Sequence, residues 1–214
     1  MTSKNLEEYN LNDFIHYLFN KFDMNDWPLI WQGKAKKALE IVYLALKNKK
    51  RDHGIPFVYH PIDVALMIKN ELKIKNPKII IIALLHDVIE QNRIMAEKNI
   101  LNKLGKSCLR SIWKLTKEHV AFGRVKKIDD DEKYFRKMLK IGDDLFIIKL
   151  SDRISNLKEL SECGDYNKIK KYIKDLDTFY IPLTIKRSKN NKYIKKLLSI
   201  LLKERKQFYG NNDF

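Results

Sequence analysis

Apolar side chains recur three or four residues apart along most of the chain, with polar residues between them. This period places one apolar stripe on each helix and predicts amphipathic helices that share a core. The first predicted helix covers residues 11–23 and is expected to pack on the rest of the protein. Further helices are predicted over 32–49, from His60-Pro61 onward, over 97–117, 145–160 and 166–183, and from about 192 to 208.

The apolar run Ile79–Leu85 admits two interpretations. Its β-branched residues suit a buried strand, but no turn residue separates it from the segment that follows, which extends to Glu90. The combined length is typical of a helix, and we expect a helix in the protein interior. The run is far shorter than the roughly 20 apolar residues that a membrane-spanning helix requires.

Two segments between the predicted helices have their own character. Residues 118–128 lack periodicity and are expected to form a loop, of a length often found in functional lids. The acidic run 129–132 precedes apolar residues at helical spacing. We interpret this run as favourable negative charge at a helix N-terminus rather than as a metal site.

These patterns favour an all-α fold, a helical bundle with a C-terminal helical extension. With only 7 Gly and 5 Pro among 214 residues, the chain has little material for a turn-rich all-β architecture. We expect a helical segment over 1–31 that packs on the core, a main helical domain over 32–185, and a basic amphipathic helix over 186–214.

The chain is strongly basic, with 43 Lys and Arg against 27 Asp and Glu, a net charge of +16. Such a charge attracts anions, and nucleic acid, an acidic membrane or a polyphosphorylated small molecule all remain open. Residues 184–214 alone hold nine basic and two acidic side chains. We favour the interpretation that the apolar stripe of this segment covers the domain's own core over one in which it binds a membrane.

The cysteine content and the N-terminal residues bear on the compartment. Cys108 and Cys163 are too few for a disulfide framework or a cysteine metal cluster, and we expect ordinary, partly buried thiols. The first ten residues show no basic-then-apolar signal pattern. We therefore expect a cytoplasmic protein without a membrane segment.

Four potential metal ligands stand in helical or helix-start contexts: His60, the adjacent pair His86-Asp87, and Asp152. Two imidazoles and two carboxylates suit a divalent first-row ion with open positions, such as manganese or iron, better than a closed structural zinc site. Adjacent helical residues point about 100° apart, so His86 and Asp87 could flank one ion on a continuous helix. The remaining ligands would arrive from distant segments of a helical bundle.

The same segments place further polar groups near the expected ligands. Glu90 follows His86 by four residues, and Asn156 follows Asp152 by four, so each pair is expected to share a helix face. A divalent ion lowers the pKa of a bound water, and a nearby carboxylate can accept the proton. The set therefore predicts metal-assisted hydrolysis. Ordinary alternatives are a hydrogen-bonded core histidine for His86 and an ion pair with Arg153 for Asp152.

Three blocks of the sequence closely resemble the hydrolase domain of the RelA/SpoT alarmone enzymes, a branch of the HD metal-dependent phosphohydrolases. They are RDHGIPFVYHPIDVA (51–65), ALLHDVIE (83–90) and KLSDRISNL (149–157), in the family's order. Weaker similarity at 115–117, 135–139 and 180–183 extends the coverage to roughly 32–185. This length leaves no room for the family's nucleotide synthetase domain, so the chain looks like a stand-alone small alarmone hydrolase.

The resemblance implies an all-helical HD domain that binds Mn²⁺ through His60, His86, Asp87 and Asp152. It implies removal of the 3′-pyrophosphate of guanosine tetra- or pentaphosphate, which yields GDP or GTP and pyrophosphate. The candidate catalytic residues are Glu90, which would help to activate water, Asn156, which would contact the substrate, and Gln91. The candidate substrate-binding residues are Arg51, which would flank the purine, Lys149, Arg153 and again Asn156.

Four positions depart from the family's pattern. Gln91 stands where the family usually has aspartate, and an amide cannot act as a base. Leu46 replaces a histidine of the first family helix, Asp52 follows the arginine where a basic residue is common, and Glu159 replaces a small hydroxyl residue. Asp52 and Glu159 add negative charge around a polyanion and leave room for an altered nucleotide.

Two alternative functions follow from these departures. One is a related HD phosphohydrolase that acts on another alarmone, a deoxynucleotide or NADPH. The other is a homologue of low activity that senses or binds nucleotides. We do not expect nucleic-acid binding, because the basic residues are spread along helices without interleaved aromatic residues. The sequence carries no signal for an oligomeric state.

Overall fold

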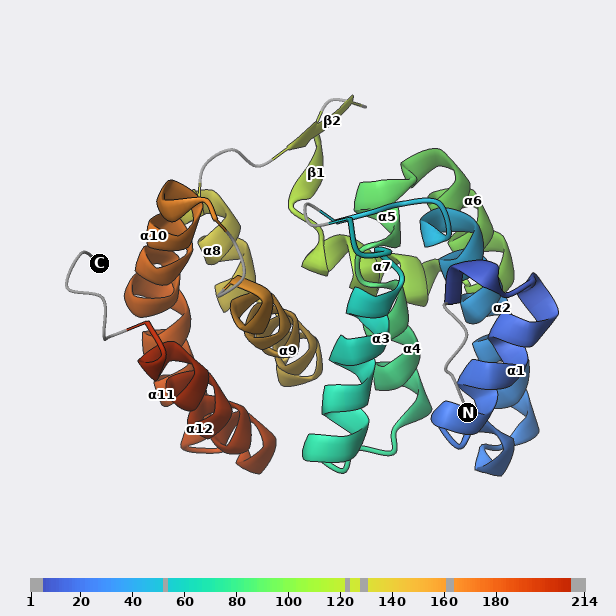
Figure 1. The fold of residues 1–214 in the computed structure, drawn as a ribbon, viewed down its shortest axis with the longest axis horizontal. Helices are drawn as coiled ribbons and strands as arrows, with labels where there is room; N and C mark the ends of the chain where they lie inside the picture. The colour runs from blue at the N-terminus through green and yellow to red at the C-terminus, as the bar shows by residue number, and fades with distance from the viewer. Residues whose placement is uncertain (1–5, 52–53, 122–123, 128–130, 161–163, 209–214) are drawn as a thin grey trace. The chain divides into compact units, whose positions relative to one another are not determined.

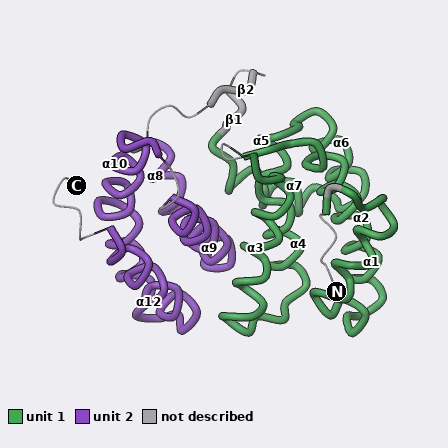
Figure 2. Tube along the Cα trace, in the orientation of Figure 1, with its two compact units in different colours: residues 1–131 green, residues 132–214 purple. Residues whose placement is uncertain are grey.

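The structure, a computed structural model, describes residues 6–51, 54–121, 124–127, 131–160 and 164–208. The chain divides into two compact units, residues 1–131 and 132–214 (Figure 2). Helices make up most of both units (Figure 1), so the predicted all-α fold is confirmed. Within the described ranges, no helix combines the length and the apolar character needed to cross a membrane.

The first unit consists of helices and one short hairpin. Its α-helices are α1 (Leu11–Lys21), α2 (Leu29–Leu46), α3 (Tyr59–Leu66), α4 (Pro77–Leu85), α5 (Val88–Gln91), α6 (Arg93–Leu104) and α7 (Lys106–Leu115). Short 3-10 turns cover Leu6–Glu8 and Met24–Asp26, and a π-helical segment, Met67–Glu71, extends α3. The strands β1 (Glu118–Ala121) and β2 (Arg124–Lys127) complete the unit.

Helix α4 forms the centre of the first unit. It starts at Pro77, and the side chain of Asn76 caps it by accepting a hydrogen bond from the Lys78 amide at 3.0 Å. All seven residues of Ile79–Leu85 are buried, and α4 contacts α2, α3 and α7. The prediction that this run is an interior helix is therefore confirmed. Helix α1 contacts α2, as expected for the N-terminal segment.

The second unit holds the remaining helices. They are α8 (Asp131–Leu139), α9 (Asp143–Leu160), α10 (Tyr166–Asp175), a π-helical segment (Leu176–Tyr180), α11 (Ile181–Ser188) and α12 (Lys192–Lys206). Helix α12 contacts α9 and α11, and its apolar residues Ile194, Leu197 and Leu201 are buried. The stripe of the basic terminal helix thus covers the unit's own core, as favoured from the sequence.

Two predicted elements are wrong in detail. The continuous helix over 97–117 is divided into α6 and α7, because Gly105 adopts a φ of 88° and its amide closes the end of α6 on the Ile100 carbonyl at 2.9 Å. The expected loop over 118–128 is instead an antiparallel hairpin of β1 and β2, with Val120 opposite Val125. β-Branched residues favour such pairing, and the run was too short to show a period.

Other boundaries shift without changing the architecture. Helix α8 begins at Asp131, at the acidic run that was predicted to precede a helix, whereas positions 129 and 130 lie outside the described residues. The helix predicted over 166–183 continues through its π-helical segment to Ser188. Asp52 and Cys163 also lie outside the described residues. The division into domains over 1–31, 32–185 and 186–214 stays a prediction.

Candidate metal centre and substrate site

Three of the four predicted ligands lie together within the first unit. His60 is in the first turn of α3, and His86 and Asp87 form the turn between α4 and α5. The His60 Nε2 atom is 3.5 Å from Asp87 Oδ2, and the His86 Nε2 atom is 3.2 Å from Asp87 Oδ1. The centroids of the two imidazole rings are 5.3 Å apart. Both histidines are only 2% exposed and the Asp87 side chain is 16% exposed, so the three donors meet at a largely buried position.

The helix does not run through His86-Asp87, contrary to the expectation from sequence. The His86 Nδ1 atom is 2.8 Å from the carbonyl oxygen of Ala83, which the backbone amide of His86 also reaches at 3.5 Å. The His86 side chain thus forms a hydrogen bond with a carbonyl oxygen in the last turn of α4, and the helix ends there. His86 and Glu90 therefore do not lie on one continuous helix, and the common face expected from their four-residue spacing stays a prediction. The break itself directs His86 and Asp87 toward His60.

The protonation of His86 follows from the same contact. A carbonyl oxygen only accepts hydrogen bonds, so Nδ1 must donate its proton to Ala83, and Nε2 of the neutral ring then carries a lone pair. That lone pair faces the Asp87 carboxylate at 3.2 Å. Two lone-pair donors so close repel each other unless a proton or a cation lies between them. Ligand bonds of about 2.1 Å at roughly right angles separate neighbouring donors by about 3 Å. The arrangement therefore fits a metal ion.

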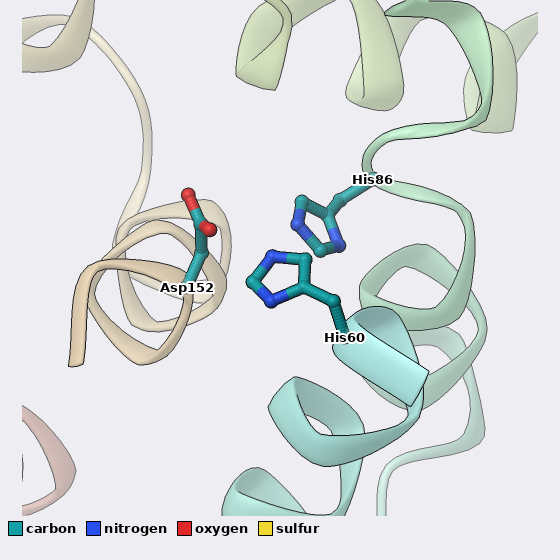
Figure 3. A group of neighbouring side chains, drawn as sticks. All are labelled: His60, His86 and Asp152. Atoms are coloured by element: carbon teal, nitrogen blue, oxygen red, sulfur yellow. The ribbon is translucent and has the colours of Figure 1, made fainter. Parts of the chain in front are cut away.

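Asp152, the fourth predicted ligand, belongs to the second unit. It lies on α9 and is 4% exposed. Its Oδ2 atom is 2.8 Å from the Lys149 ammonium, and its Oδ1 atom accepts a hydrogen bond from the Asn156 amide at 2.6 Å. The predicted four-residue pair of Asp152 and Asn156 is therefore confirmed. Figure 3 draws His60, His86 and Asp152, three buried residues that each offer one ligand atom.

The candidate base Glu90 is exposed on the short helix α5. One of its carboxylate oxygens accepts a hydrogen bond from the backbone amide of Lys117, at the end of α7, at 2.7 Å. This bond fixes the position of the Glu90 side chain. The sequence analysis missed Lys117, since a backbone donor 27 residues away leaves no mark in the sequence. Gln91 is the last residue of α5 and is half-buried.

Arg51 is connected to the histidines through an aromatic ring. Its guanidinium carbon is 5.6 Å from the centroid of the Phe57 ring, which in turn lies edge-on to His60 at 6.2 Å. The turn that holds Arg51 is closed by its amide on the Ile55 carbonyl at 2.8 Å and by its carbonyl on the Gly54 amide at 2.9 Å. Gly54 in this turn has a φ of 77°, a left-handed conformation that glycine adopts without a steric penalty. Phe57 was not singled out from the sequence.

Lys149 and Arg153, predicted to bind substrate, are both buried in the second unit at 6% exposure. Burial alone would lower the pKa of Lys149, but Asp152, and then Tyr134, raise it well above its usual value. Arg153 stacks against two rings, 5.2 Å from the centroid of Tyr172 and 4.6 Å from that of Tyr180. Direct contact of either cation with a substrate stays a prediction.

The other departures from the alarmone pattern have different environments. Leu46 is fully buried at the end of α2, so its position contributes to the core. Glu159 is half-buried near the end of α9. A leucine in the core provides no polar group toward a substrate, whereas Glu159 keeps a carboxylate within one turn of Asn156.

Comparisons with known proteins agree with this picture. Residues 38–188 match the family model of the HD domain. The chain is 33% identical over 153 residues to the guanosine-3′,5′-bis(diphosphate) 3′-pyrophosphohydrolase of Aquifex aeolicus and 30% identical over 150 residues to that of Borreliella burgdorferi. These matches cover 70% and 69% of this chain but only 21% and 22% of the relatives, so the chain spans about a fifth of their length.

A smaller relative and a solved structure cover more of their own chains. The pyrophosphohydrolase MESH1 of Danio rerio is 25% identical over 125 residues, which cover 56% of this chain and 67% of that protein. A solved metazoan orthologue of SpoT, described as hydrolysing ppGpp, has a TM-score of 0.57 at 20% identity. The match covers 78% of this chain and 94% of the solved one and shows the common fold.

In this all-helical architecture, a histidine from one helix lies beside a histidine–aspartate dipeptide that follows another helix. This combination defines a class of helical proteins with a potential metal site. Within the first unit, His60, His86 and Asp87 offer imidazole and carboxylate donors of the kind that bind divalent metal ions. The match over 38–188 then identifies the family. The chain belongs to the HD-domain family.

Proposed function

We propose that this protein hydrolyses the 3′-pyrophosphate of guanosine alarmones, ppGpp or pppGpp, to GDP or GTP and pyrophosphate. The observation that carries the proposal is the convergence of His60, His86 and Asp87 at the break between α4 and α5. The similarity to pyrophosphohydrolases over about 150 residues supports the substrate class. The exposed Glu90 and the basic character of the chain suit a reaction in which water attacks a polyanion.

We infer that Asp152 joins His60, His86 and Asp87 as the fourth ligand of one Mn²⁺. Asp152 is buried on α9, and Asn156 and Lys149 hold both of its oxygens. A set of two imidazoles and two carboxylates suits manganese, which accepts mixed nitrogen and oxygen donors. When bound, such an ion lowers the pKa of water and offsets the charge of phosphate oxygens.

The remaining residues have roles that their contacts support. Glu90 is held by the Lys117 amide and would accept a proton from the attacking water. Asn156, oriented by Asp152, would donate a hydrogen bond to the substrate near the reacting phosphate. Arg51 presents a planar guanidinium beside Phe57 and would stack on the purine. Lys149 and Arg153 would contribute positive charge behind Asp152.

A direct test measures pyrophosphate release from ppGpp by the full chain, with Mn²⁺ and with EDTA. Asp87→Asn and Asp152→Asn are expected to lower kcat by at least about a hundredfold, since each removes a charged ligand. Asp144→Asn is the matched control, because Asp144 is an exposed aspartate in the first turn of α9. Circular dichroism checks that each variant keeps its helices. Unchanged activity in Asp87→Asn would contradict the proposal.

A panel of pppGpp, deoxynucleotides and NADPH separates the proposed substrate from those of related phosphohydrolases. Turnover of one of these without turnover of ppGpp would favour the related enzyme class. Binding of ppGpp without turnover would favour a nucleotide-sensing homologue instead.

Gln91 is the specific observation that favours weak catalysis, because it supplies an amide beside Glu90 where the resemblance calls for a carboxylate. We expect Gln91→Asp to raise kcat, with Glu90→Gln as the opposite change. If Gln91→Asp leaves kcat unchanged while Glu90→Gln lowers it, Glu90 alone carries the proton transfer.

A further inference from the structure

The first unit has a cavity away from the histidines. Its volume is about 550 Å³, within the range of roughly 300–1,000 Å³ that small-molecule sites occupy. It lies where the π-helical extension of α3 ends and α4 begins, and the turn before α2 closes its other side. His60 lies in the first turn of α3 and His86 directly follows α4, so both are at the ends of these helices away from the cavity. The nine residues of α4 span about 13 Å between its two ends.

The backbone around this cavity is unusual. Among the described residues, Asp23 and Lys73 are the non-glycine residues with a positive φ, of 52° and 57°, and both line the cavity. The π-helical segment Met67–Glu71 supplies two more lining residues, Lys69 and Asn70. Left-handed non-glycine residues and π-helical turns each cost free energy and concentrate at functional sites. Their coincidence at one cavity is a reason to look for a ligand there.

The position of Lys73 would ordinarily be occupied by glycine. The Leu72 amide closes the π-helical segment on the Met67 carbonyl, and the Ile74 amide reaches the Ile68 carbonyl, both at 3.3 Å. This pattern ends a helix with a left-handed residue between the two amides, for which glycine has no steric penalty. The chain keeps a lysine at this position, and its exposed side chain lines the cavity.

The charge around the cavity favours an anion. Lys69 and Asp23 neutralise each other, because the ammonium lies 2.6 Å from the carboxylate and also donates to the Lys21 carbonyl at 2.9 Å. Lys73 and Lys75 are exposed lining residues, and Asp26 is the other acidic residue of the lining, so the lining as a whole has three lysines and two aspartates.

The start of α4 adds to this positive potential. Pro77 and Ile80 of its first turn also line the cavity, and a helix N-terminus carries a partial positive charge. The cavity therefore has a net positive potential.

An aromatic surface completes the cavity. The Trp27 indole is half-buried, and Pro28 lies beside it in the lining. The backbone of Trp27 is held on both sides, by its amide on the Met24 carbonyl at 3.2 Å and by its carbonyl on the Gln32 side-chain amide at 2.8 Å. The backbone position of Trp27 is thus fixed, and its indole in the lining offers an aromatic surface for stacking.

We propose that this cavity binds a small organic anion with a flat ring, of the class of purine mononucleotides. The ring stacks on Trp27, and the phosphate contacts the ammonium groups of Lys73 and Lys75 near the start of α4. Asp26 accepts hydrogen bonds from the exocyclic amine or the sugar hydroxyls. This site is independent of the proposed hydrolase chemistry.

The test titrates AMP into the full chain in EDTA, followed by calorimetry and by tryptophan fluorescence. We expect saturable millimolar or tighter binding, a weakening of about tenfold in Trp27→Ala, and about threefold in Lys73→Gly and in Lys75→Gln. Lys98→Gln is the matched control, because Lys98 is an exposed lysine of α6 outside the cavity. Trp27→Phe keeps an aromatic ring and should retain most of the affinity while it removes the fluorescence change.

The variant Lys73→Gly tests whether the lysine at this left-handed position contributes to ligand binding. Because glycine relieves the left-handed strain, the variant should melt about 2–4 °C higher while it binds AMP more weakly. The proposal is overturned if AMP shows no saturable binding at millimolar concentrations, if inorganic phosphate binds as tightly as AMP, or if the Trp27 and lysine variants bind AMP like the unmodified chain. In Arg51→Ala, the AMP binding that depends on Trp27 should persist; loss of all AMP binding in this variant would place the nucleotide at the histidine site instead and would also overturn the proposal.

Discussion

The buried ion pair of Lys149 and Asp152 makes the sharpest prediction about stability. The ammonium and the carboxylate are 2.8 Å apart, and their side chains are 7% and 5% exposed. At an effective dielectric constant of about 20, two unit charges at this distance attract each other by about 6 kcal/mol. Desolvation offsets much of this attraction, so the pair itself adds little net stability, but either partner left alone in the interior is expensive.

We therefore expect Lys149→Met to lower the free energy of unfolding by about 3–5 kcal/mol, and Asp152→Asn by a similar amount. Methionine keeps most of the volume of lysine and its contact with Tyr134, where the ammonium lies 5.6 Å from the ring centroid. The double variant removes both charges of this pair, and Asn156 still finds an oxygen at position 152. Its stability should return to within about 1 kcal/mol of the unmodified chain.

The assay is urea unfolding followed by far-ultraviolet circular dichroism, in EDTA, for all four proteins. The coupling free energy comes directly from this double-mutant cycle. Burial opposes the charge on Lys149, yet Asp152 holds its pKa well above the usual value. A cation with a raised pKa stabilises the fold at every pH below its unfolded value, so the cycle should give one result from pH 6 to 9. Single losses below about 1 kcal/mol, or additive losses in the double variant, would refute the reasoning.

The remaining predictions concern two glycines and a thiol. Gly33 is exposed within α2 with open space around it, so Gly33→Ala should stabilise the chain by about 0.5–1 kcal/mol, whereas Gly105→Ala should destabilise it by about 1–2 kcal/mol because of the φ of 88°. Chemical denaturation measures both, and equal effects would contradict the backbone argument. Burial raises the pKa of Cys108 to about 11, against the smaller opposing influence of nearby lysines. With Cys163 replaced by serine, the Cys108 thiol should react slowly with a disulfide reagent near pH 7 and faster as the pH approaches about 11. The free energy of unfolding should fall between pH 9 and about pH 11, because the folded state favours the neutral thiol.

Local patterns of the chain were sufficient for the helices and for most of the candidate ligands. Apolar spacing located α1, α2, α9 and α12, because each buries one stripe, and the all-apolar run Ile79–Leu85 identified the interior helix α4. The spacing of Asp152 and Asn156 predicted their contact, because both lie on one uninterrupted helix. Such features depend only on neighbours along the chain.

The predictions from the sequence failed where the structure depends on a contact that local spacing does not describe. The break at His86 depends on its side chain binding the Ala83 carbonyl, which an apolar pattern does not encode. Glu90 is held by the backbone amide of Lys117, between α7 and β1, and the hairpin after α7 forms by pairing of two short segments.

The sequence alone determined which segments are helical and which side chains have the chemistry of metal ligands, because both are properties of residue type and local spacing. Only the tertiary structure decided that His60, His86 and Asp87 face one another at a helix break, that Lys149 is a buried partner of Asp152, and that Asp23 and Lys73 meet at one cavity. These arrangements arise because packing brings distant backbone and side-chain atoms together, and the free energy of each contact depends on that packing.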